Sequence, residues 1–237
     1  NRPYGTAAEY SIVPNNYAIY LPDTQSFSSG ACLGVPAVTA YQALFSDGDI
    51  GGLTVLISGG AGRVGRYAVQ IAKYSGATVI ATASSTEKCQ HITNLGADHV
   101  LNYRTDDIVS KVLRITGGRG VDRMVDAAFS ANVGKAPQLI KANGTLASYS
   151  SDDCAVPSIP FLDYMYKNIA IKPFSIYSIS ETVQIKAFEY INKMLKTNSL
   201  KHLIGADQPF KDLILAHQNV EKNNVFGCCL VNIQDVE

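Results

Sequence analysis

The chain has 237 residues, of which 46% are hydrophobic and 17% charged, a balance typical of a folded, water-soluble α/β protein. Its 20 basic and 20 acidic residues give a formal net charge of +0, so no electrostatic attraction favours nucleic acid or an anionic membrane. No apolar run approaches the length of a membrane-spanning helix, and we expect neither nucleic acid nor a membrane as a partner.

The first part of the chain predicts short strands followed by a helix. Residues 1–24 alternate apolar and polar side chains and turn at Pro22-Asp23, a pattern typical of two short strands. Residues 26–46 have a helical pattern that Pro36 interrupts. Residues 1–3 form neither an initiator nor a signal sequence, so we expect the chain to begin inside a longer protein.

A glycine-rich turn between a strand and a helix organises the middle of the chain. The run at 54–57 predicts a buried strand, which leads into Gly60-x-Gly62-x-x-Gly65 and then into apolar residues at helical spacing. This order is typical of a dinucleotide-binding unit, whose glycines permit a tight turn, approach to a pyrophosphate, and packing of helix on strand. The helix N-terminus would bind the phosphates. A glycine turn without a ligand is the alternative.

Strands and helices alternate through the rest of the middle region. We expect helices at 62–74, 86–95, 106–115 and 133–141, and further strands at 78–82, 99–101, 123–127, 145–149 and 168–171. Repeated units of this kind predict a parallel sheet covered on both faces, here an α/β, doubly wound Rossmann sheet of about six strands. After Pro173 we expect helices at 180–196 and 210–221 and a last strand at 229–233.

The end of the second strand favours NADP(H) over NAD(H). No acid stands there to accept a hydrogen bond from a ribose 2′-OH, except Glu87, which also suits a helix start. Ser84, Ser85 and Lys88 instead offer hydroxyls and a positive charge, which suit a 2′-phosphate. The alternatives are an ordinary helix cap for Ser84 and a solvated helix face for Lys88.

Several short motifs outside the glycine turn resemble one group of enzymes. They are Gly34-Val35-Pro36-Ala37-Val38-Thr39-Ala40-Tyr41, Ala8-Glu9-Tyr10, Asn102-Tyr103-Arg104, and Ala216-His217 followed by Gly227. Together they resemble the zinc-independent quinone oxidoreductases (zeta-crystallin type) of the medium-chain dehydrogenase/reductase superfamily. The resemblance covers essentially the whole chain.

The resemblance implies a GroES-like catalytic domain ahead of the Rossmann domain, with most of it outside this chain. We expect 1–24 to be a remnant of that domain, 25–178 to be the NADP-binding Rossmann domain, and 179–237 to be C-terminal helices and a strand that pack on, or return to, the catalytic domain. The chain departs from the family at Arg63, where glycine is usual, and at Cys228, where a basic residue is usual. Arg63 could lie beside the pyrophosphate or point to solvent.

Together, the motif and the resemblance give a set of expected cofactor contacts. The resemblance implies that the serine and lysine positions after the second strand contact the 2′-phosphate of NADPH, with Tyr103 nearby. Thr39, Ala127, Phe129 and Phe174 are expected to face the nicotinamide, although each could simply be packing. The expected cofactor-binding residues are Gly60, Gly62, Arg63, Val64, Ser84, Ser85, Lys88, Tyr103, Thr39, Phe129 and Phe174.

The expected chemistry needs no metal. Zinc alcohol dehydrogenases of the superfamily have a cysteine ligand just before the helix motif, but residues 35–39 contain none, and Cys32 fits a helix core. The four histidines form no triad with a nucleophile. Without a Lewis acid, the expected reaction is hydride transfer from NADPH to a quinone or another conjugated carbonyl. The alternatives are an enoyl or alkenal double-bond reductase, and a non-catalytic NADP(H)-binding protein of crystallin-like or truncated kind.

Two further expectations concern assembly and compartment. The strand at 168–171 should end the sheet, and its exposed edge would allow a homodimer unless 180–196 covers it. The five cysteines show no CxxC pair, which indicates reduced thiols and a cytoplasmic protein.

Overall fold

The computed structural model describes residues 5–151 and 154–233. The chain divides into two compact units, a sheet unit of Val35–Ala187 and a terminal unit of Asn1–Gly34 with Phe188–Glu237. Two helices contribute to both units: α1 (Phe27–Phe45), which breaks at Gly34 where φ is +28°, and α8 (Glu181–Lys196). In the described residues, no helix is both long and apolar enough to cross a membrane.

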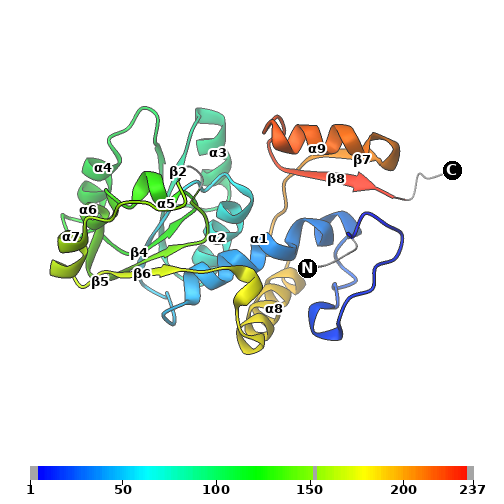
Figure 1. The fold of residues 1–237 in the computed structure, drawn as a ribbon, viewed down its shortest axis with the longest axis horizontal. Coiled ribbons are helices and arrows are strands. Elements are labelled where there is room, and N and C mark those ends of the chain that lie inside the picture. The colour runs from blue at the N-terminus through cyan, green and yellow to red at the C-terminus, as the bar shows by residue number, and fades with distance from the viewer. Residues whose placement is uncertain (1–4, 152–153, 234–237) are drawn as a thin grey trace. The chain divides into compact units, whose positions relative to one another are not determined.

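The sheet unit contains a six-stranded parallel sheet in the order β3-β2-β1-β4-β5-β6 (Figure 1). Its strands are β1 (Thr54–Ile57), β2 (Thr78–Ala83), β3 (His99–Asn102), β4 (Val121–Asp126), β5 (Ile140–Ser148) and β6 (Ala170–Pro173). This order confirms the predicted doubly wound Rossmann fold. The strand order reverses between β1 and β4, and ligands of such sheets bind at the carboxyl ends of the strands at this point.

Helices pack on both faces of the sheet. They are α2 (Arg63–Tyr74), α3 (Thr86–Asn94), α4 (Ile108–Ile115), α5 (Phe129–Asn132), α6 (Ala136–Leu139) and α7 (Phe161–Tyr166), followed by the 3-10 turn η2 (Ile176–Ser178). Four residues that are register partners on neighbouring strands point to one face of the sheet: Ile80, Leu56, Met124 and Leu146. They form the core of that face with side chains from α4, α6 and α7, namely Val112, Leu139 and Tyr164. Because side chains alternate along a strand, Val55 and Ile57 face the other side, and α2 packs against β1 and β2.

One predicted helix of the sheet unit is wrong. The expected helix at 133–141 is replaced by the short helices α5 and α6, and β5 already begins at Ile140. Pro137 permits only the first turn of a helix, and the pairing of Ile140 with Val121 extends the sheet instead. The expected strands at 145–149 and 168–171 are present, with shifted ends.

The terminal unit contains the parallel pair β7 (Ile204–Pro209) and β8 (Cys228–Asn232), connected by η3 (Phe210–Asp212) and α9 (Leu213–Glu221). β7 was not predicted. The two strands predicted for residues 1–24 are wrong for the described part of that range, which holds only the 3-10 turn η1 (Asn15–Tyr17). Tyr10 and Ile12 are almost fully exposed there, so no strand partner or core covers the apolar side chains.

The core account predicts different effects for two isoleucines. Ile80→Ala removes a fully buried side chain from the central sheet and should lower the free energy of unfolding by about 2–5 kcal/mol. Ile185→Ala on α8, where the side chain is 49% exposed, should change it by less than about 0.5 kcal/mol. Urea unfolding followed by circular dichroism measures both, and equal losses would contradict the assignment of the core.

Candidate nucleotide-binding site

The chain leaves β1 through a turn that backbone hydrogen bonds hold in place. The N–H of Ser58 donates to the carbonyl of Val125 at 2.9 Å, and that of Gly60 donates to the carbonyl of Thr82 at 2.8 Å. The Thr82 hydroxyl accepts from the N–H of Gly59 at 3.1 Å. The turn is therefore fixed to β2 and β4, the two neighbours of β1.

Glycine is needed at each of these positions of the turn for a different physical reason. Gly59, one residue before the predicted motif, has φ +69° and so makes the tight turn that was expected at Gly60. A Cβ on Gly60 would lie 3.0 Å from the Cβ of Ala81, so glycine is needed here because a side chain would have too little room. A Cβ on Gly65 would lie only 2.2 Å from the carbonyl oxygen of Gly59, so α2 packs directly on the turn.

The start of α2 fits a pyrophosphate. Gly62 is its N-cap and supplies no side chain, so no side-chain cap hydrogen bond occupies the first turn. Arg63 is exposed and Val64 is half-buried in that turn. Free N–H groups and the positive end of the helix dipole both favour an anion here, and the glycine backbone leaves room for it.

A first cavity of about 590 Å³ adjoins the turn and spans the switch point, with lining residues on β1, β2 and β4. Its apolar wall includes Leu56, Met124 and Leu139, and Ser58, Tyr103, Asp106, Asp107, Asn132 and Lys135 are among its polar residues. Hydrogen bonds from Lys111 and from Ser110 lower the pKa values of Asp106 and Asp107, respectively, so both remain ionised. Lys111 pairs with Asp106 and Lys135 lines the same cavity, so the carboxylates are balanced by cations, and the apolar wall suits an uncharged ring.

A second cavity of about 490 Å³ lies at the carboxyl ends of β5 and β6. Its lining includes Phe129 and Phe174, which the sequence predicted to lie near one another at the nicotinamide. The N–H of Phe174 donates to the carbonyl of Ser148 at 3.0 Å, and its ring centroid lies 6.3 Å from that of Tyr149. Phe129 and Phe174 thus come together, whereas Ala127 lines the first cavity.

The residues expected at a 2′-phosphate gather near the end of β2. Ser84 and Ser85 follow β2 directly, and the N–H of Tyr103 donates to the carbonyl of Ala83 at 3.0 Å. Ser85, rather than Ser84, caps α3, because its hydroxyl accepts from the N–H of Lys88 at 3.3 Å. Of these four residues, only Tyr103 lines the first cavity.

Thr39 does not join these groups. Its side chain is buried in α1, and its hydroxyl donates to the carbonyl of Val35 at 2.7 Å. It lines neither the first nor the second cavity. A nicotinamide contact for Thr39 therefore stays a prediction.

Sequence reasoning missed a polar cluster at the switch point. Asp126, at the end of β4, has no exposed surface, and its Oδ1 accepts from Nδ2 of Asn132 at 2.7 Å. The same Nδ2 lies 3.1 Å from Oγ of Ser58, to which it donates. Ser58 could have been found from the sequence, because it stands directly before the glycines of the turn. Asn132 could not, because no sequence spacing connects Asn132 with Ser58.

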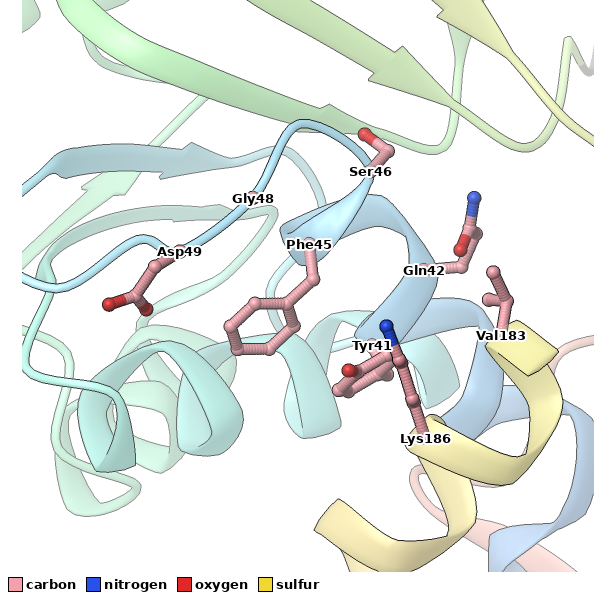
Figure 2. A pocket seen from close by; sticks show the side chains of 8 residues that line it. All are labelled: Tyr41, Gln42, Phe45, Ser46, Gly48, Asp49, Val183 and Lys186. Carbon is pink, nitrogen blue, oxygen red and sulfur yellow. The ribbon is translucent and has the colours of Figure 1, made fainter.

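A third pocket, of about 360 Å³, lies away from the glycine turn (Figure 2). Tyr41 and Phe45 of α1 and Lys186 of α8 line it, together with the loop that enters β1. That loop precedes β1 and so stands at the amino end of the strand, opposite to the end where parallel sheets bind nucleotides. We therefore exclude this pocket as the nucleotide site.

The described residues contain no group of three or more His, Cys, Asp or Glu side chains that could hold a metal ion. Cys32 is buried on α1, as expected of a core residue. The expectation of chemistry without a metal stays a prediction.

Comparisons with known proteins find relatives in sequence and in fold. Quinone oxidoreductase of Pongo abelii is 28% identical over 217 residues, which are 91% of this chain and 65% of that protein. A structure described as the quinone oxidoreductase from Thermus thermophilus and its complex with NADPH has a TM-score of 0.86 at 26% identity, covering 98% of this chain and 75% of that one. An NAD-dependent alcohol dehydrogenase has a TM-score of 0.84 at 28% identity, covering 97% of this chain and 66% of that one.

The chain spans 65% of the length of that curated relative. The family model described as zinc-binding dehydrogenase matches residues 64–193, which run from the first turn of α2 into α8 and make up more than half of the chain. This family name describes the family as a whole and assigns no zinc to this chain. The chain belongs to the zinc-binding dehydrogenase family, which confirms the resemblance to medium-chain dehydrogenases and reductases.

Proposed function

We propose that the protein is an NADP(H)-dependent oxidoreductase that transfers hydride to a quinone or another conjugated carbonyl compound. The observation that carries this proposal is the glycine turn at the switch point, with one cavity against it and a second at the carboxyl ends of β5 and β6. A dinucleotide has the matching order of parts: two end groups joined by a pyrophosphate.

Each part of the site has one task in this proposal. The first turn of α2 binds the pyrophosphate through its N–H groups. The first cavity holds the adenine, which is uncharged and tolerates the carboxylates of Asp106 and Asp107. The second cavity holds the nicotinamide beside the rings of Phe129 and Phe174. When bound, the cofactor supplies the hydride, and the protein supplies orientation.

The similarity to quinone oxidoreductases supports a conjugated acceptor, which can take hydride without a metal. An enoyl or alkenal double-bond reductase is the alternative within the same chemistry, and a non-catalytic NADP(H)-binding protein is the alternative outside it. The expected GroES-like remnants at both ends of the chain belong to this proposal. So does a cytoplasmic location, supported by cysteines that form no disulfide with one another in the described residues.

Oxidation of NADPH with 9,10-phenanthrenequinone should test the reaction. We expect the absorbance of the reduced nicotinamide to fall with the quinone and to stay constant without it, because the quinone accepts hydride and a solvent proton to give the hydroquinone. The control replaces the quinone with an α,β-unsaturated ketone, and turnover of the ketone alone would favour the double-bond reductase. Binding of NADPH without turnover of either acceptor would favour the non-catalytic alternative.

The cofactor preference should depend on Lys88. We expect Lys88→Ala to weaken NADPH binding by about 10- to 150-fold, the effect of one charge-assisted hydrogen bond, and to leave NADH binding unchanged. Calorimetric titration with both nucleotides measures this. Lys211→Ala is the matched control, because Lys211 is exposed on η3 and lines neither cavity, and its removal should change the binding of neither nucleotide. An unchanged preference in Lys88→Ala would reject the 2′-phosphate assignment.

We also propose a homodimer through the β6 edge of the sheet. β6 ends the sheet as predicted, and the nearby helix α7 exposes Phe161, Leu162 and Tyr166 by 67%, 56% and 77%. An open strand edge beside exposed apolar side chains favours association with a second copy.

Light scattering coupled to size exclusion should therefore give twice the chain mass. Leu162→Glu, which places a charge in the exposed apolar surface, should shift the mass to that of a monomer without loss of circular dichroism. Ile214→Glu on α9, another exposed apolar position at 74%, is the control and should remain dimeric. A monomeric wild-type chain would contradict the dimer.

A further inference from the structure

The polar cluster at the switch point joins three separate elements. Nδ2 of Asn132, at the end of α5, donates to Oδ1 of Asp126 at the end of β4 and to Oγ of Ser58 after β1. Asp126 is fully buried, and besides Asn132, the Ser58 side chain and the backbone N–H groups of Ala127 and Ala128 stabilise its charged form. Burial raises the pKa of this carboxyl, against the hydrogen bond from Asn132.

Burying a carboxyl costs free energy, and hydrogen bonds offset only part of that cost. The cluster therefore calls for a reason other than stability. Its location suggests one, because Ser58 and Asn132 both line the first cavity.

The helix that Asn132 ends is short, and its first residue, Phe129, packs against the edge of the core. α5 has four residues, none of them buried, and no side chain caps it. At its start, the N–H of Phe129 donates to the carbonyl of Ser150 at 3.1 Å. Yet α5 contributes to both cavities, with Phe129 in the second and Ala131 and Asn132 in the first. Any displacement of α5 would change the shape of both cavities at once.

We propose that Asp126 is a positioning residue that, through Asn132, holds α5 between the two cavities and so sets their shape for the dinucleotide. Asp126 has no exposed surface, so in this proposal it acts on the nucleotide only through Asn132. This inference rests on the proposed function, because it assumes that the two cavities hold the two ends of one nucleotide.

Three variants test this role. Asn132→Ala removes the donor that connects α5 with β4. Asp126→Asn keeps an oxygen for that donor and removes the charge. Asp122→Ala is the matched control: it lies on the same strand, its Oδ2 accepts from the N–H of Thr54 at 2.7 Å, and it lines neither cavity. Calorimetric titrations use NADPH and 2′,5′-ADP as probes, and thermal unfolding of the same samples reports stability.

We expect Asn132→Ala to weaken binding of both probes by about tenfold, the effect of about one hydrogen bond, and Asp126→Asn to bind within about twofold of wild type. Asp122→Ala should lose stability and keep its affinity. Hydrogen exchange of the amides in α5 should become faster in Asn132→Ala and stay unchanged in Asp126→Asn. This readout separates a positioning role from a general loss of stability.

Two results would overturn the proposal while wild type still binds NADPH. One is an Asn132→Ala variant that binds both probes as tightly as wild type. The other is an Asp126→Asn variant that loses as much affinity as Asn132→Ala, because then the hydrogen bond would not be what matters. A wild-type chain that binds neither probe would instead reject the proposed function, and this inference with it.

Discussion

The tightest constraint in the sheet unit lies between α2 and the turn before it. A side chain at position 65 would place its Cβ 2.2 Å from the carbonyl oxygen of Gly59 and 2.7 Å from Cα of Gly60, distances that real Cβ atoms essentially never show. Gly65 therefore lets the helix begin against the end of β1. The N-terminus of α2 consequently points its N–H groups at the place where the strand order reverses.

From this constraint the rest of the site follows in steps. The turn is fixed to both neighbouring strands, to β2 through Thr82 and to β4 through Val125. The first cavity lies against this turn and has lining residues on β1, β2 and β4, and the second lies at the carboxyl ends of β5 and β6. The helix between the cavities, α5, has no fully buried residue; Phe129 packs against the edge of the core, and a buried hydrogen-bond cluster connects Asn132 with β4.

The sequence was sufficient to predict features that depend on local pattern. The βα repeat predicted the parallel sheet. The glycine spacing predicted the turn, because only glycine leaves room for the close packing of the helix on the end of the strand. Features that depend on distant partners were missed. Apolar spacing after Val133 suggested a helix to 141, but the pairing of Ile140 with Val121 made a strand of its last part. Asn132 and Ser58 lie 74 residues apart, so no local pattern could connect them.

A crystal structure of the chain with NADPH tests the central claim most directly. The account predicts that the pyrophosphate accepts hydrogen bonds from N–H groups in the first turn of α2, with adenine in the cavity beside Tyr103 and nicotinamide beside Phe129 and Phe174. NADPH bound elsewhere, for example in the pocket of Tyr41 and Lys186, with the glycine turn free of phosphate, would contradict it.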